Sequence, residues 1–188
     1  MRLFLAVHLS DEIKTNIEQT IETLKTAKAD VKWIRKEALH ITLKFLGDTD
    51  KSRVKGIIPL LSYTAKEVKP FTFITGKPGA FPDMDKPKVL YTGLSSGKTE
   101  IISLSKIIDE TLVKAAFKRE EKPFNPHITL GRCTSVLNLP KLKEALLNTI
   151  SPEIEQKVEA FYLVKSELIG NTAVYKDLEE FNLSKYSR

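Results

Sequence analysis

The tetrapeptide His-Ile-Thr-Leu occurs twice in this chain, at positions 40–43 and 127–130, and this repeat constrains the fold more than any other feature. Polar and apolar residues alternate within it, a period of two that predicts a β-strand with one polar and one buried face. The polar face carries His40 and Thr42 in the first copy, and His127 and Thr129 in the second. The sequence therefore predicts two similar strands, each presenting an imidazole beside a hydroxyl.

Histidine is otherwise rare, because only His8 lies outside the repeat. Imidazole titrates near pH 6.5, so one histidine of a facing pair can accept a proton while its partner donates one. Threonine hydroxyls can donate hydrogen bonds to oxygens on which negative charge grows in a transition state. Two such strands facing across a cleft would form a symmetric acid/base site, whereas His8 is expected to be structural.

Helices and strands are predicted to alternate on either side of the repeat. Ser10 is a good N-cap for the first helix, and Pro59 is expected to kink or restart the second. Proline and glycine around residues 76–79 predict irregular chain, and Gly170-Asn171 is suited to a tight hairpin. The expected strands are 1–8, 31–34, the stretch from 40 to 48, 71–74, 89–91, the stretch from 127, 158–169 and 172–178; the expected helices are 11–27, one capped by Asp50, 99–117 and one starting at 138–140.

These elements fall into two comparable blocks, each with one copy of the motif, which suggests an internal duplication. A chain of 188 residues with 41% hydrophobic content can build a full core. No apolar run is long enough to span a bilayer, and residues 1–8 are predicted to form a strand rather than a secretory signal.

Charge and cysteine content limit the possible partners and compartment. The net charge of +6 and the pI near 9.2 are compatible with an anionic partner such as RNA, and equally with a surface made soluble by lysine. Cys133 is the single cysteine, which excludes an internal disulfide and favours the cytoplasm. No carboxylate or cysteine is spaced from the histidines as zinc ligands would be, so no metal site is expected.

The two H-x-T-x motifs and their flanks resemble those of the two-histidine (2H) phosphoesterase superfamily. Within it the RNA 2′,3′-cyclic phosphodiesterase branch, historically called 2′-5′ RNA ligases, is the most similar. The matching flanks are Arg2-Leu3-Phe4-Leu5-Ala6, Leu43-Lys44-Phe45-Leu46-Gly47, Phe124-Asn125-Pro126 and Gly131-Arg132. This resemblance covers nearly the whole chain.

The resemblance implies an α+β fold in which residues 1–188 form a single domain of two intertwined, pseudo-symmetric lobes. Each lobe has an antiparallel sheet backed by helices, with the active-site groove between them. It implies hydrolysis of RNA or nucleotide 2′,3′-cyclic phosphate ends to 2′-phosphomonoesters, without metal or other cofactor, and a possible reversible 2′-5′ RNA ligation. The implied partners are such RNA or nucleotide ends and no membrane, and the protein is expected to be a cytoplasmic monomer.

The resemblance also assigns roles: His40 donates a proton to the leaving ribose oxygen, and His127 activates water. The residues alone do not break the symmetry between the two. A binding module that holds an RNA end or nucleotide without turnover would need the same groove, but it would not need both histidines to titrate.

Two cations beside the motifs are candidate phosphate contacts. Lys44 has the same parity as His40 and Thr42, which predicts the same strand face. Arg132 has the opposite parity to His127 unless Gly131 introduces a bulge. For both, the alternative is an ordinary solvated side chain.

Overall fold

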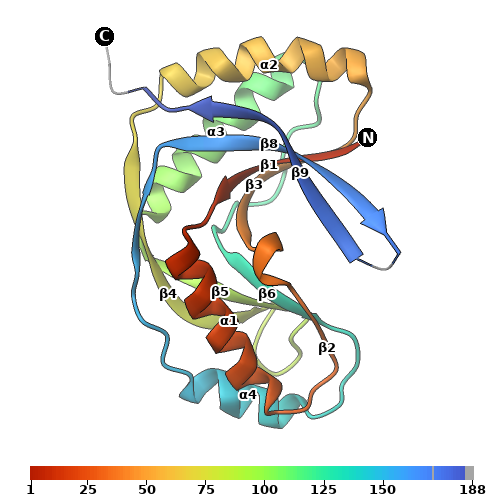
Figure 1. The fold of residues 1–188 in the computed structure, drawn as a ribbon, viewed down its shortest axis with the longest axis vertical. Helices are drawn as coiled ribbons and strands as arrows, with labels where there is room; N and C mark the ends of the chain where they lie inside the picture. Colours follow the sequence, from red (N-terminus) through yellow and green to blue (C-terminus); the bar gives the residue numbers. More distant parts are fainter. Residues whose placement is uncertain (171, 185–188) are drawn as a thin grey trace.

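The computed structural model describes residues 1–170 and 172–184, which form a long antiparallel sheet with helices at both ends (Figure 1). The expected α+β fold is confirmed. In chain order the elements are β1 Arg2–His8, α1 Asp11–Lys25, β2 Val31–Trp33, the 3₁₀ turn η1 Lys36–Ala38, β3 His40–Asp48, α2 Lys51–Lys66, β4 Phe71–Phe81, β5 Val89–Ser96, α3 Lys98–Lys114, β6 Ile128–Cys133, α4 Leu139–Asn148, β7 Glu155–Val158, β8 Ala160–Ile169 and β9 Thr172–Asn182.

The order of strands across the sheet divides it into two matching halves. The order is β7-β4-β5-β6-β3-β1-β8-β9, and β2 pairs with the outer part of β6. The two strands that carry the motifs, β6 and β3, are therefore central neighbours. Each is flanked on its outer side by one long antiparallel partner, β5 for β6 and β1 for β3.

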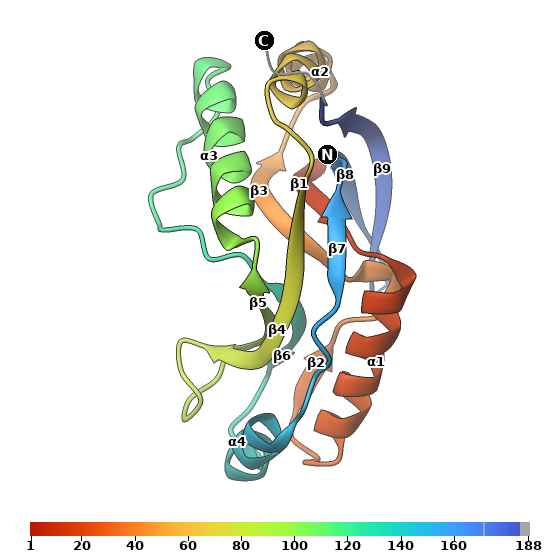
Figure 2. The same cartoon turned by 90° about the vertical axis from the view of Figure 1, so that its left-hand side faces the viewer.

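Helices from different parts of the chain cover the two halves. α2 packs on α3 and β9, and α3 packs on β3, so both belong to the half that contains the first motif. α1 packs on α4 and η1 in the other half; Figure 2 shows these two groups at opposite ends of the molecule. α1 thus follows β1 in the chain but packs in the other half of the sheet.

The hydrophobic core runs continuously through both halves. It contains the apolar faces of α1, α2, α3 and α4 and the buried face of the motif strands. Ser10 caps α1 as predicted, its side chain accepting a hydrogen bond from the Ile13 amide. Ile13 and Ile17 then face inward, one helical turn apart.

One local prediction was wrong, and of the two alternatives predicted at Pro59 the restart does not occur. α2 continues through Pro59 without a restart; Pro59 and Lys55, whose carbonyl loses its helical donor, are both exposed, so water can satisfy that carbonyl. The proline- and glycine-rich stretch 76–79 lies within β4 rather than in irregular chain, and its pairing with β5 is interrupted by register shifts there.

The end of the chain extends further in strand than expected. β8 and β9 pair antiparallel up to Ile169 and Thr172, and β9 continues to Asn182. Asn171, the second residue of the predicted hairpin turn, is outside the described residues. Among the described residues no helix is both long and apolar enough to cross a membrane.

Candidate active site

The two motif copies meet at the centre of the sheet. Ile41 on β3 pairs with Ile128 on β6, and both side chains are completely buried. Since side chains alternate along a strand, the histidines and threonines on either side of these isoleucines lie on the opposite face, as predicted. The tertiary structure thus brings together two motifs that are distant in the sequence.

Each histidine is oriented by the same backbone hydrogen bond. Nδ1 of His40 lies 2.7 Å from the carbonyl oxygen of Ala38, and Nδ1 of His127 lies 2.8 Å from that of Asn125. A carbonyl can only accept, so Nδ1 carries a proton in both rings. In the neutral imidazole, Nε2 therefore has the free lone pair and is the atom available for proton transfer.

The threonines lie beside the histidines on the same face. The Oγ1 of Thr42 lies 2.8 Å from Nε2 of His40, and the hydroxyl donates to this nitrogen when the ring is neutral. Thr129 is half-buried and pairs with Tyr91 of β5. Both hydroxyls are thus on the face that carries the imidazoles.

The surroundings favour the neutral form of both rings. Burial lowers the pKa of His40 to about 4; the Ala38 carbonyl opposes this change, and the charges of His8 and His127 add to it. Burial also lowers the pKa of His127. The hydrogen bond to the Asn125 carbonyl opposes this change, and the positive charge of Arg132 adds to it. The effect of His127 on the pKa of His40 agrees with the placement of the two motifs on adjoining strands.

Aromatic rings flank both histidines in a matching arrangement that sequence reasoning missed. His40 lies 4.9 Å from the ring of Phe4 and 5.4 Å from that of Tyr175, measured between centroids. His127 contacts Phe81 and Tyr91 edge-on, at 5.1 and 5.8 Å. These rings come from four different strands, and no spacing in the sequence connects them to the motifs.

Lys44 does not lie on the histidine face, which corrects the prediction from parity. On β3, Thr42 pairs with Ala6 and Lys44 with Leu5, so Leu43 is an extra, bulged residue. The bulge turns Lys44 to the opposite face, where its Nζ lies 2.6 Å from Oδ1 of Asp109 and is buried. Lys44 is therefore not available to contact a phosphate there.

The second motif has a bulge at the equivalent leucine. Here the bulge places the neighbouring cation, Arg132, on the histidine face instead of removing it from that face. Tyr91 pairs with Thr129, but Leu90, the residue before Tyr91 on β5, pairs with Gly131, so Leu130 is bulged. Arg132 thereby shares a face with Thr129 and Tyr91, and its side chain is exposed. It is close enough to influence the pKa of both His127 and Tyr175.

Gly131 permits the close approach of β2 at this bulge. A Cβ atom on it would lie 2.6 Å from Cγ1 of Val31 and 3.0 Å from the Trp33 ring. The bulge on which the Arg132 prediction depended is thus present, but at Leu130, one residue before Gly131. Within the residues that the structure describes, no three His, Cys, Asp or Glu side chains are grouped as metal ligands would be.

Comparison with known proteins gives relatives over the full chain. A Methanothermobacter thermautotrophicus protein named RNA 2′,3′-cyclic phosphodiesterase is 32% identical over 184 residues, covering 97% of this chain and 99% of the relative. A Methanocaldococcus jannaschii protein of the same name is 33% identical over 183 residues, covering 96% and 100%.

The fold has a solved counterpart. The crystal structure of Thermus thermophilus TT0787 superposes with a TM-score of 0.80 at 26% identity, covering 99% of this chain and all of that one. The family model of the 2′-5′ RNA ligase superfamily matches residues 13–169, which include both motifs. The chain therefore belongs to the 2′-5′ RNA ligase superfamily of two-histidine phosphoesterases, as its paired H-x-T-x motifs indicated.

Proposed function

We propose that this protein hydrolyses RNA or nucleotide 2′,3′-cyclic phosphate ends to 2′-phosphomonoesters, with His40 as general acid and His127 as general base. The relatives named above support cyclic phosphodiesterase activity. The observation that carries the proposal is that the same backbone hydrogen bond orients both imidazole rings. Nδ1–H of each ring donates to the backbone carbonyl two residues earlier, which leaves Nε2 of each ring as the atom for proton transfer.

The reaction needs one proton transfer at each histidine. Nε2 of His127 takes a proton from water as the water oxygen attacks phosphorus. The bond from phosphorus to the ribose 3′ oxygen breaks, and this oxygen takes a proton from Nε2 of His40. Each transfer contributes about 10²–10⁴ to the rate. The same pair can serve 2′-5′ ligation, in which the 5′ hydroxyl of a second RNA takes the place of water, gives its proton to His127 and attacks phosphorus. The 3′ oxygen again leaves with a proton from His40, and a 2′-5′ phosphodiester remains.

The remaining groups bind the phosphate. Thr42 and Thr129 would donate hydrogen bonds to the non-bridging oxygens, whose negative charge grows in the transition state. Arg132 shares this face and supplies a positive charge. These groups and the histidines form a complete acid/base site, and the proposed reaction requires no metal ion.

Turnover of a nucleoside 2′,3′-cyclic phosphate in the presence of EDTA tests the proposal. The wild-type protein should be fully active, and His40→Ala and His127→Ala should each lose more than about 10²-fold in kcat/KM. Thr42→Val and Thr129→Val should lose less, and Thr23→Val on the exposed face of α1 is the matched control. Undiminished activity in either histidine variant would exclude the acid/base pair.

The product identifies which histidine is the acid. Release of a 2′-phosphate shows that the 3′ oxygen departs, whereas a 3′-phosphate would require the opposite assignment. If the protein binds a 2′-nucleotide but turns over no cyclic phosphate, it is a binding module. Failure in EDTA with recovery on adding Mg²⁺ or Zn²⁺ would contradict metal independence.

A further inference from the structure

A cavity of about 270 Å³ lies directly beside His40, between β1, β9 and η1. It is slightly smaller than typical small-molecule pockets, which span roughly 300–1,000 Å³. Its size suits one nucleoside rather than several. His40 and Leu39 form one wall, and Phe4, Val164 and Tyr175 form the apolar part of the lining.

The position of the cavity matches the side on which the leaving group must lie. In an in-line displacement, water attacks from the side of the base and the ribose oxygen departs towards the acid. If His40 is the acid, as proposed above, the ribose and its nucleobase lie on the His40 side of phosphorus. This inference therefore rests on the proposed function.

The apolar wall suits a flat base. The rings of Phe4 and Tyr175 meet nearly at right angles, with centroids 5.1 Å apart. Phe4 is buried, whereas Tyr175 is half-buried and faces the cavity from β9. A planar base can pack on such a surface, and stacking on an aromatic ring is worth roughly 1–3 kcal/mol per base.

The polar part of the lining combines carboxylates with a cation. Asp177 is held in place, since its Oδ2 lies 2.9 Å from Nε2 of His8, and the His8 ring stacks on Tyr162 at 4.1 Å. Glu37 and Lys14 also line the cavity. No hydrogen bond or ion pair of the Glu37 carboxylate is found within the described residues, so this carboxylate can accept hydrogen bonds from a ligand.

We propose that this cavity is the nucleoside subsite and that it selects guanine, with Glu37 as the residue that recognises the base. Guanine presents two adjacent donors, N1–H and N2–H₂, which match the two oxygens of a carboxylate, and its O6 can accept from Lys14. Uracil presents one N–H with a carbonyl on either side. The same carboxylate would therefore face hydrogen-bond acceptors, which repel it, on both sides of a single donor. Adenine and cytosine each offer one amino group and are intermediate.

Steady-state kinetics with the four nucleoside 2′,3′-cyclic phosphates tests this specificity. We expect kcat/KM for the guanosine substrate to exceed that for the uridine substrate by at least about tenfold, mainly through KM. Glu37→Gln should reduce the ratio to about threefold or less, because an amide presents one donor and one acceptor. Glu144→Gln, an exposed substitution on α4, should leave the ratio unchanged.

Equilibrium binding separates failure of the subsite from failure of the proposed function. If none of the four substrates is turned over, the proposed function is wrong, and the affinities for 2′-GMP and 2′-UMP still test the cavity. Tighter binding of 2′-GMP that is lost in Glu37→Gln supports the subsite in either case. Equal kinetics and equal affinity for guanosine and uridine ligands, or a preference that persists in Glu37→Gln, would overturn it.

Discussion

His40 and His127 occupy equivalent positions, but their surroundings are not equal. Both donate Nδ1–H to a carbonyl two residues earlier. His40 is the more affected by burial, which lowers its pKa to about 4, and its Nε2 already contacts Thr42. A bound phosphate anion would stabilise the protonated ring and raise its pKa, so the substrate itself helps to place the proton on the acid.

The lowered pKa values predict an acidic optimum. The active form of the pair carries one proton; above both apparent pKa values both rings are neutral and no acid remains. Because burial lowers the pKa of both histidines, both limbs of the bell-shaped curve should move below the ordinary value of 6.5. The optimum of kcat/KM, measured from pH 4 to 9, is therefore expected below 6.5, whereas an optimum above 7.5 or a flat profile would contradict it.

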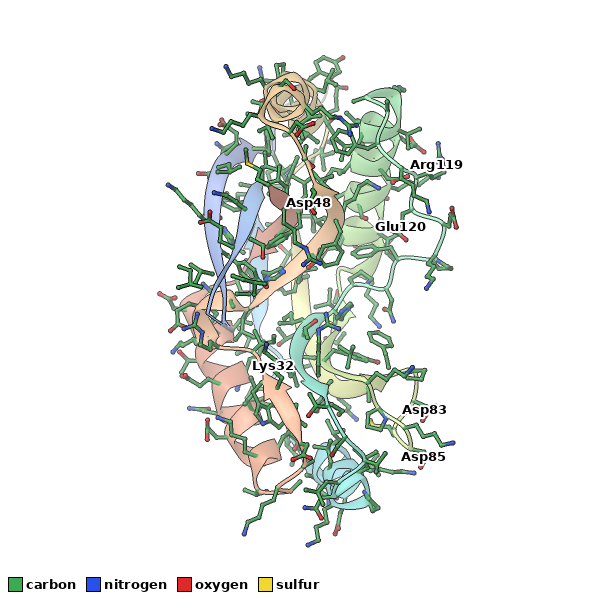
Figure 3. The ribbon with its side chains drawn as sticks, turned by 90° about the vertical axis from the view of Figure 1, so that its right-hand side faces the viewer. Lys32, Asp48, Asp83, Asp85, Arg119 and Glu120 are labelled. Carbon is green, nitrogen blue, oxygen red and sulfur yellow. The ribbon has the colours of Figure 1, made fainter. Side chains whose placement is uncertain are left out.

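At the level of elements, a buried ion pair connects the first motif strand to the helix behind it and to the chain leading to the second motif. Nζ of Lys44 on β3 contacts Asp109 on α3 and donates to the carbonyl of Lys118. Asp109 also accepts from the Glu120 amide. Figure 3 shows Arg119 and Glu120 on the segment that leaves α3.

This pair should be important for stability rather than for phosphate binding. Burial alone would raise the pKa of Asp109, but the hydrogen bonds from Lys44 and Glu120 hold it below the usual value. Lys44→Met would leave this carboxylate buried without its main partner and should lower the free energy of unfolding by about 3–5 kcal/mol.

Urea unfolding measures this effect. Lys44→Met combined with Asp109→Leu should recover most of the loss, because no unpaired charge remains. Lys157→Met, which removes an exposed pair with Glu159, should cost no more than about 1 kcal/mol. A single variant as stable as the double variant would show that the buried pair is unimportant.

At the scale of the whole molecule, the net positive charge should increase the affinity for RNA oligonucleotides more than the affinity for mononucleotides. The chain carries a net charge of +6, and Arg132 is exposed on the face that carries the histidines. Each phosphate of single-stranded RNA that is neutralised adds roughly −0.7 to the slope of log affinity against log salt.

We therefore expect kcat/KM for an RNA oligonucleotide ending in a 2′,3′-cyclic phosphate to fall more steeply with NaCl than that for a cyclic mononucleotide. Rates at 50–400 mM NaCl test this expectation. Arg132→Gln should lower kcat/KM for both substrates, because it lowers the affinity for the terminal phosphate. Identical slopes for the two substrates would show that the net charge only provides solubility.

Local patterns predicted much of the fold because they depend on residues close in sequence. The alternation around His40 and His127, the Ser10 cap and the helical spacing of Ile13 and Ile17 all specify an element without distant partners. The prediction failed at residues 76–79, where sheet pairing outweighed the local preference, and the helix restart expected as one alternative at Pro59 does not occur.

The sequence by itself determined the two motif strands, their buried and polar faces, and the identity of the paired imidazoles and hydroxyls, since each follows from a period of two. Only the tertiary structure decided which cation shares their face. The bulges at Leu43 and Leu130 are set by hydrogen bonding to β1 and β5, strands that are distant in the chain. They turn Lys44 into the core and Arg132 towards the site, and long-range packing likewise places Tyr175 of β9 beside His40.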